Sequence, residues 1–312
     1  MSFFRSVYVV DNMSSSTRMC RRAVRIILDV GIFMAVSILA GLMSFNKLRI
    51  NPTVRGFFCD DQSLMYPYRP DTVSIGLVCI LCVVTPAILM AIIEGILHYQ
   101  SRQKGEGWNH LKYATTCYKT IGVFLFGMGL TQILGEIGKL VVGRLRPHFF
   151  DVCKPDYNKI DCFKNNFSVY VNVGDQYCTG TDLSLLTDAR KSFLSNHAST
   201  AFFGFTYFII YLQVRFIWTR LEIFRLLLQS VSMVVALYVG FSRIMDYKHH
   251  WSDVLGGAVL GTMVAILKVR FILVLPYHRD SWDRQYGIRS ADGSGIHADK
   301  GNLESQEMKE LL

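Results

Sequence analysis

Six apolar runs of about 20 residues constrain the fold of this 312-residue chain more than any other feature of its sequence. Runs of this length predict helices that span a membrane, because a helix satisfies its own backbone hydrogen bonds without water. The expected spans cover residues 26–43, 73–97, 118–142, 198–218, 223–241 and a last stretch from about 254. Because Lys268 and Arg270 interrupt the last run, it reaches spanning length only if its helix begins near His249. The sequence therefore predicts an all-α, six-transmembrane helical bundle.

The spans form one domain that is followed by a tail. We expect an N-terminal cytoplasmic segment at 1–25, the six-span domain at 26–278 with a large outer loop at 143–197, and a tail at 279–312. The tail mixes glycines with acidic and basic residues, which is typical of disorder. The first 25 residues contain no apolar core before a cleavage site, so no removable signal peptide is expected.

The net charge of +9 could indicate nucleic-acid binding, but a membrane explains it more simply. Basic residues gather beside the spans, at 18–25, at 102–112 and from 279 onward. An excess of lysine and arginine normally marks the cytoplasmic side. However, Lys47, Arg49 and Arg55 lie just beyond the first span and nearly balance its basic flank, so charge orients the chain poorly. No nucleic-acid partner is predicted.

Four cysteines and a glycosylation sequon orient the chain better. Cys59, Cys153, Cys162 and Cys178 all lie in the two long loops on the side opposite the termini, and Asn166 begins the sequon Asn-Phe-Ser in the larger loop. Both features are typical of an oxidising lumenal or extracellular space, so the termini are expected in the cytoplasm. The sequence leaves all pairings of the four cysteines open.

Three charged clusters stand at the ends of apolar runs. The first extends from Lys139 to Pro147, the second is Ser195-Asn196-His197, and the third extends from Ser242 to Asp253. In the expected topology all three reach the same membrane face. Such convergence of distant segments predicts a functional site.

The clusters contain the groups that phosphoryl transfer needs. Arg146 and Arg243 can offer bidentate guanidinium forks and Lys139 a point charge to phosphoryl oxygens. Ser195 and Asn196 begin a helix, where backbone N–H groups and the helix dipole favour an anion. These five residues are the predicted phosphate-binding residues.

The histidines provide the nucleophile and the acid. His249 can attack phosphorus as a neutral imidazole, and Asp253, four residues later, shares its face of a helix and is expected to orient it. His197 can protonate the departing alkoxide. Both motif histidines are thus explained, and no carboxylate cluster accompanies them, so neither a metal nor another cofactor is predicted.

These residues resemble the motifs of the type 2 phosphatidate phosphatase superfamily, and more closely those of the animal lipid phosphate phosphatases. The family pattern is K-x6-R-P, then P-S-G-H, then S-R-x5-H-x3-D. The first motif is intact from Lys139 to Arg146, and the third is intact at Arg243, His249 and Asp253. The segments G-R-L-R-P-H-F and D-Y-K-H-H-W-S-D resemble the lipid branch in particular, and the resemblance covers about residues 20–275.

The second motif departs from the pattern, since it reads Leu194-Ser195-Asn196-His197. Glycine in this position tolerates a positive φ and a close approach of the backbone to phosphate. Asparagine is among the residues least penalised in a left-handed conformation, so the backbone is expected to remain usable. Reduced activity is one expected result, and Asn196→Gly is expected to preserve or raise turnover.

The resemblance implies a lipid phosphate phosphatase of the plasma membrane whose active site faces the extracellular or lumenal side. Its implied substrates are phosphatidate, lysophosphatidate, ceramide 1-phosphate and sphingosine 1-phosphate, and its intermediate a phosphohistidine on His249. Self-association into a homo-oligomer is also implied. One alternative, which Asn196 favours, is a catalytically weak relative that binds lipid phosphates or acts as a scaffold. A transporter is a third reading, but intramembrane ionisable pairs are sparse.

Other polar residues near the clusters have simpler expected roles. Glu136, one turn before Lys139, is expected to pair with that lysine, and Glu94 to reach the interface. Arg144 fits the phosphate site and a headgroup or solvent-facing position equally well. His148 is expected to be an ordinary loop residue, and His250 is expected to be a packing residue.

Overall fold

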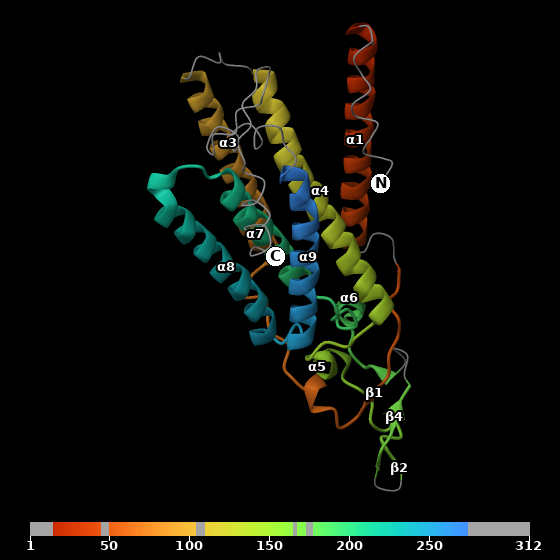
Figure 1. Ribbon diagram of the computed structural model, residues 1–312. Coiled ribbons are helices and arrows are strands. Elements are labelled where there is room, and N and C mark those ends of the chain that lie inside the picture. The colour runs from red at the N-terminus through yellow and green to blue at the C-terminus, as the bar shows by residue number, and fades with distance from the viewer. Residues whose placement is uncertain (1–14, 45–49, 104–109, 165–166, 173–176, 274–312) are drawn as a thin grey trace, which may run out of the picture. The chain divides into compact units, whose positions relative to one another are not determined.

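The computed structural model describes residues 15–44, 50–103, 110–164, 167–172 and 177–273 (Figure 1). Long helices dominate this part of the chain, which confirms the predicted helical class. They are α1 (Ser15–Ser44), α2 (Ile75–Cys79) continued by the π-helix η3 (Ile80–Val84) into α3 (Thr85–Gln103), α4 (His110–Val142), α7 (Asn196–Arg215), α8 (Glu222–Met245) and α9 (Trp251–Leu273). The shorter elements are β1 (Phe57–Phe58), η2 (Gln62–Leu64), α5 (Phe149–Cys153), β2 (Phe163–Lys164), β3 (Phe167–Ser168), β4 (Tyr170–Val171), α6 (Leu183–Asp188) and η5 (Thr219–Leu221).

Each expected span corresponds to a helix. Within the described ranges, four helical stretches are long and apolar enough to cross a membrane: Ile75–Ser101, His110–Val142, Glu222–Met245 and Trp251–Val269. The apolar part of α1, Ile27–Met43, is shorter. The count of six spans therefore stays a prediction. The last helix begins at Trp251, two residues after His249, so this histidine precedes the helix and does not lie on its first turn.

The exposed and buried faces of α8 carry the residue types expected of a helix in lipid. Its exposed positions carry large apolar side chains such as Ile223 and Val234, whereas small or polar residues such as Ser232, Ala236 and Gly240 face the other helices. In water the apolar face of a helix turns inward. The opposite arrangement fits a helix whose outside contacts hydrocarbon and whose inside packs closely.

A buried ion pair joins α3 to α7 near the end opposite the motifs. Arg215 donates through Nε to Glu94 over 2.8 Å and through Nη2 to the second carboxylate oxygen, and the Tyr211 hydroxyl donates to the same acid over 3.1 Å. Glu94 is 3% exposed, so the expectation that it reaches the interface is wrong. Pairing removes the cost of an isolated charge in an apolar interior, which is why the acid can stay inside.

Two glycines allow α9 to pack directly on the first turns of α7. A Cβ at Gly257 would lie 2.5 Å from the Ser195 carbonyl oxygen, and one at Gly261 would lie 2.3 Å from the Ser199 carbonyl oxygen. Small residues four positions apart let helix backbones approach closely in membranes. The contact fixes the start of α9 against the start of α7, where the second and third motifs lie.

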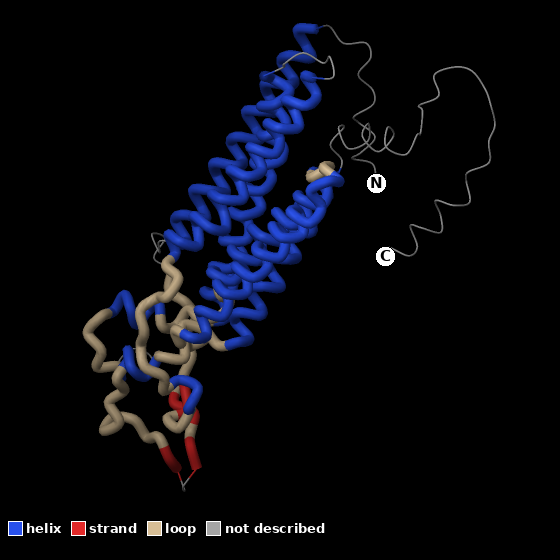
Figure 2. The backbone as a smooth tube through the Cα atoms, turned by 90° about the vertical axis from the view of Figure 1, so that its left-hand side faces the viewer, coloured by secondary structure: helices blue, strands red, loops and turns tan. Residues whose placement is uncertain are grey.

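The loops gather at one end of the helices, where Figure 2 shows the strands and most of the irregular chain. We call the described residues of 50–74 and 144–195 the cap. β1 pairs antiparallel with β4, which joins the two long loops, and β2 pairs with β3 as a hairpin. Phe57, Leu64, Phe149, Phe150 and Leu186 form an apolar core beneath them. The sequon residue Asn166 and the predicted tail at 279–312 lie outside the described residues.

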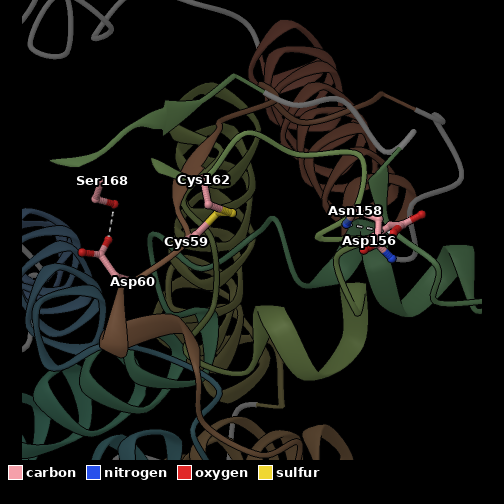
Figure 3. The surroundings of a disulfide bond; sticks show 6 residues. All are labelled: Cys59, Asp60, Asp156, Asn158, Cys162 and Ser168. Atoms are coloured by element: carbon pink, nitrogen blue, oxygen red, sulfur yellow. Dashed lines mark hydrogen bonds between the residues drawn. A yellow bond between two sulfur atoms is a disulfide. The ribbon is translucent and has the colours of Figure 1, made fainter. Parts of the chain in front are cut away.

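Two disulfides close the cap and answer the pairing question that the sequence leaves open. Cys59 is bonded to Cys162, which links the first long loop to the second (Figure 3). Beside this bond, the Ser168 hydroxyl donates to Asp60 across the same two loops. Cys153 is bonded to Cys178 within the second loop. The cap is therefore held covalently as well as by its small core.

Removal of the Cys59–Cys162 bond is expected to destabilise the cap more than removal of the Cys153–Cys178 bond. The first bond closes a separation of 103 residues and the second one of 25, and chain-entropy loss in the unfolded state grows with loop length. Cys59→Ser with Cys162→Ser should cost about 2–4 kcal/mol. The measurement is the melting temperature of the purified protein in detergent, with the Cys153→Ser, Cys178→Ser pair as the matched control. An equal or larger fall in melting temperature for the Cys153→Ser, Cys178→Ser pair would contradict the prediction.

Candidate functional site

The three charged clusters meet at the cap end of the helices, as the sequence predicts. Backbone hydrogen bonds connect them. The Ser192 N–H donates to the Arg144 carbonyl over 3.0 Å, which joins the end of the first cluster to the approach to the second. The Ser195 N–H donates to the Asp253 carbonyl over 3.1 Å, which joins the second to the third. The positions of these motifs are therefore set by the backbone.

Gly143 turns the chain directly after α4. Its φ is +58°, a conformation that glycine adopts without strain, and a Cβ there would lie 1.9 Å from the Thr53 carbonyl oxygen. Its N–H donates to the Lys139 carbonyl over 3.1 Å, which closes the last turn of the helix. The turn brings Arg144 and Arg146 back to the end of the helix that carries Lys139.

Glu136 is shared by two predicted site residues. Lys139 donates to its Oε1 over 2.9 Å, which confirms the expected pair. Asn196 donates to the same oxygen through Nδ2 over 2.6 Å. Asn196 fits there because its neighbour on α4 is Gly135, whose missing Cβ would lie 2.2 Å from the asparagine Oδ1. The asparagine amide is thus hydrogen-bonded through Nδ2, while its buried Oδ1 has no hydrogen-bond partner in the described part of the chain.

The two predicted arginine ligands are buried and already paired with acids. Arg146 donates through Nη2 to Asp188 over 2.8 Å, while its buried Nε has no partner within the described residues. Arg243 is 1% exposed and donates to Asp246 over 2.7 Å and to Asp71 over 3.1 Å. Paired guanidinium groups of this kind are held in place before any phosphate arrives.

Asp253 is the N3 residue of α9 and caps that helix. Its Oδ2 accepts the His250 N–H over 3.0 Å, which is the reverse half of a capping box, and the His250 ring nitrogen Nδ1 lies 3.2 Å from it. Its Oδ1 accepts from Arg144 over 2.6 Å. Arg144, whose role the sequence leaves open, is therefore an ion-pair partner of Asp253, and His250 does more than pack.

His249 is oriented by a backbone carbonyl instead of by Asp253. Its Nδ1–H donates to the Ser192 carbonyl over 2.6 Å. The expected contact with Asp253 assumed that both residues lie on one helix face, but His249 lies in the bend before α9. Asp253 instead accepts the Ser192 hydroxyl over 2.6 Å. The expectation of direct orientation by Asp253 is wrong.

The second motif begins α7 as predicted. Ser195 is the N-cap residue, and the N–H groups that follow it have no carbonyl partner inside the helix. Asn196 is the first helical residue and does not have a positive φ, so the expected left-handed strain is absent. The Ser195 hydroxyl and the His197 Nε2 are buried and have no hydrogen-bond partner in the described part of the chain.

Electrostatics keep His249 neutral. Burial, and after it the positive charges of Arg146 and Lys139, lower the pKa of His249 well below its ordinary 6.5. A neutral imidazole whose Nδ1 carries the hydrogen leaves Nε2 with a free lone pair. Arg146 and Lys139 belong to the first cluster and His249 to the third, so their effect on its pKa agrees with the convergence of the clusters.

Contacts of His148 and Lys248 join the cap to the segment that carries His249. His148 lies in the loop before α5, as expected, but it is fully buried. Its Nδ1–H donates to the Tyr247 carbonyl over 2.8 Å, and burial lowers its pKa to about 4. The Lys248 ammonium lies 3.8 Å from the centre of the Tyr68 ring. These contacts seat the segment that carries His249 against the cap.

The site also contains four residues that were not expected from the sequence: Asp71, Asp188, Ser192 and Asp246. Asp246 had a readable signal, because it follows Arg243 by three residues at the end of a helix and pairs with it. It also accepts the Thr72 N–H over 2.8 Å, which holds the first loop to the third motif. Asp71 and Ser192 lie in loops, and Asp188 is the last residue of the short helix α6, so none of the three had a periodic signal. In the described residues, no group of three His, Cys, Asp or Glu side chains could hold a metal ion.

Comparisons with known proteins match the part of the chain that carries the three motifs. Residues 120–275, which contain all three motifs, match the PAP2 superfamily. Phospholipid phosphatase 2 of Homo sapiens is 37% identical over 254 residues, covering 81% of this chain and 84% of that protein. Phospholipid phosphatase 1 of Rattus norvegicus is 38% identical over 231 residues, covering 72% of this chain and 77% of that protein. No solved structure matches the chain.

The contact of Asn196 with Gly135 revises the expected effect of Asn196→Gly. The substitution removes a buried donor to Glu136, so it should lower stability by about 1–3 kcal/mol and should not raise turnover. Gly135→Ala should also destabilise, by about 1–3 kcal/mol, because its Cβ would meet the asparagine.

The double variant is the decisive measurement. The three atoms closest to a Cβ at Gly135 all belong to Asn196. Gly135→Ala should therefore cost little further in an Asn196→Gly background, when melting temperature and phosphate release are measured for all four proteins. Additive losses in the double variant would show that the two positions do not share this contact.

Proposed function

Because the chain belongs to the PAP2 superfamily and to its lipid phosphate phosphatase branch, we propose that it hydrolyses lipid phosphate monoesters through a phosphohistidine on His249. The substrates we propose are phosphatidate, lysophosphatidate, ceramide 1-phosphate and sphingosine 1-phosphate. The curated relatives are phospholipid phosphatases, which supports a lipid substrate. The apolar helices place the chain in a bilayer, where such substrates reside.

The observation that carries the mechanism is a set of buried polar atoms around a neutral histidine. Arg146 Nε, Ser195 Oγ and His197 Nε2 have no partner among the described residues. A buried polar group without a partner costs about 1–3 kcal/mol. Phosphoryl oxygens can accept from all three, and the Lys139 ammonium adds charge-assisted stabilisation.

The reaction that these groups support has two displacements. In the first, the Nε2 lone pair of His249 forms a bond to phosphorus while the bond from phosphorus to the lipid oxygen breaks. His197 takes part as the imidazolium, a form that the charge of the bound phosphate dianion favours, and it gives its Nε2 proton to that oxygen, so the dephosphorylated lipid leaves. In the second, water attacks the phosphohistidine and returns a proton to His197, which frees His249 and inorganic phosphate. Each atom and proton is accounted for without a cofactor.

We also propose that the cap faces the extracellular or lumenal side of the plasma membrane and that both termini are cytoplasmic. The two disulfides of the cap support this orientation, because disulfides persist in oxidising compartments. The proposed site lies at the same end of the helices as the cap. Self-association stays a prediction from the resemblance. The alternative of a scaffold is not favoured, since both motif histidines are present and Asn196 is helical.

The test is phosphate release from a panel of the four lipids by the protein in mixed micelles. His249→Ala should lower kcat by at least about 10³-fold, because the covalent intermediate cannot form. His98→Ala, on α3 at the opposite end of the helices, is the matched control and should keep wild-type turnover. Equal activity of wild type and His249→Ala would reject the mechanism. No phosphate release from any lipid by wild type would reject the function.

His197→Ala tests the general acid separately. Loss of leaving-group protonation should slow lipid substrates by about 10²–10⁴-fold. An activated ester such as p-nitrophenyl phosphate has a better leaving group and should slow less. If the variant slows both substrates equally, His197 binds phosphate instead of donating the proton.

A further inference from the structure

Ser192 uses each of its polar groups on a different part of the site. It is fully buried, in the short stretch between α6 and α7. Its N–H donates to the Arg144 carbonyl, its carbonyl accepts from His249 Nδ1 over 2.6 Å, and its hydroxyl donates to Asp253 Oδ2 over 2.6 Å. Ser192 thus bridges the Asp253 carboxylate and the His249 imidazole of the third motif, although it belongs to none of the three motifs.

Asp253 is a fixed anchor for this bridge. It is fully buried, and its carboxylate also accepts from Arg144 and from the His250 N–H that begins α9. A carboxylate held by several donors has little freedom to move. Because it holds the Ser192 hydroxyl, it also fixes the position of the peptide carbonyl that faces His249.

We infer that Ser192 is a positioning residue for His249 and that Asp253 acts on the histidine through it. The inference rests on the proposed function, in which His249 Nε2 attacks phosphorus. A carbonyl can only accept, so Nδ1 must carry the hydrogen and Nε2 must carry the lone pair. When phosphorus bonds to Nε2, the ring becomes cationic, and the bond from Nδ1–H to the fixed carbonyl strengthens.

The role of the hydroxyl can be separated from that of the carbonyl. Every residue at position 192 would supply a carbonyl, but only a side chain that donates can hold it to Asp253. Ser192→Ala keeps the carbonyl and removes the hydroxyl. Ser192→Cys keeps nearly the same packing and replaces a strong donor with a weak one. Ser232→Ala is the matched control, because this buried hydroxyl on α8 donates to the Leu228 carbonyl away from the site.

The experiment measures kcat and KM for phosphatidate with wild type, both Ser192 variants, Asp253→Asn, the Ser192→Ala, Asp253→Asn double variant, Ser232→Ala and His249→Ala. Rates are normalised to folded protein by size-exclusion chromatography and melting temperature. We expect both Ser192 variants to lower kcat, the alanine variant by about 10- to 100-fold, with KM little changed. The double variant should be no slower than Asp253→Asn alone, because both substitutions interrupt one connection. Ser232→Ala should keep the wild-type kcat.

Two outcomes would overturn the inference. One is a kcat within about twofold of wild type for folded Ser192→Cys or Ser192→Ala, well short of the loss expected for a positioning residue. The other is multiplied losses in the double variant, which would mean that Asp253 acts on His249 by a separate route. If His249→Ala is inactive in either case, the proposed function stands and only the role of Ser192 fails. If His249→Ala is fully active, the proposed mechanism fails.

Discussion

The buried carboxylate of Asp253 holds the proposed site together. It caps α9, pairs with Arg144 from the end of α4, and accepts the hydroxyl of Ser192 from the approach to α7. Its own backbone carbonyl accepts the Ser195 N–H. One residue thus connects the three segments. The glycines of α9 make these contacts geometrically accessible, because they allow its first turns to lie against those of α7.

The features of the fold and site that could be predicted from the sequence are those that depend on local sequence patterns. The apolar runs predict the helices. The three motifs stand at ends of these runs that the expected topology brings to one membrane face, which predicts their convergence. The Glu136–Lys139 pair was predictable from a spacing of three residues on a helix. Arg243 and Asp246 have the same spacing at the end of α8 and form the same kind of pair.

The parts that sequence could not predict depend on where a loop lies in space. Asp71 reaches Arg243 from a loop, and Asp188 reaches Arg146 from the end of the short helix α6, where the sequence shows no helical periodicity. The disulfide pairing depends on how the cap folds, and the sequence spacing of the cysteines does not determine it. Two expectations failed because a backbone conformation was assumed. His249 precedes its helix, so Asp253 does not share its face, and Asn196 is helical, so glycine has no strain to relieve there.

The pairing of the site's cations with acids affects how a substrate reaches it. Lys139, Arg146 and Arg243 each face a carboxylate, so from beyond a Debye length of about 8 Å the group exerts little net field. These three pairs therefore contribute little long-range attraction for soluble anions, and their donors act on a phosphate mainly at contact. A lipid needs no such steering, because lateral diffusion in the bilayer delivers its headgroup to the helix ends. Free phosphate esters in solution lack this delivery by the bilayer.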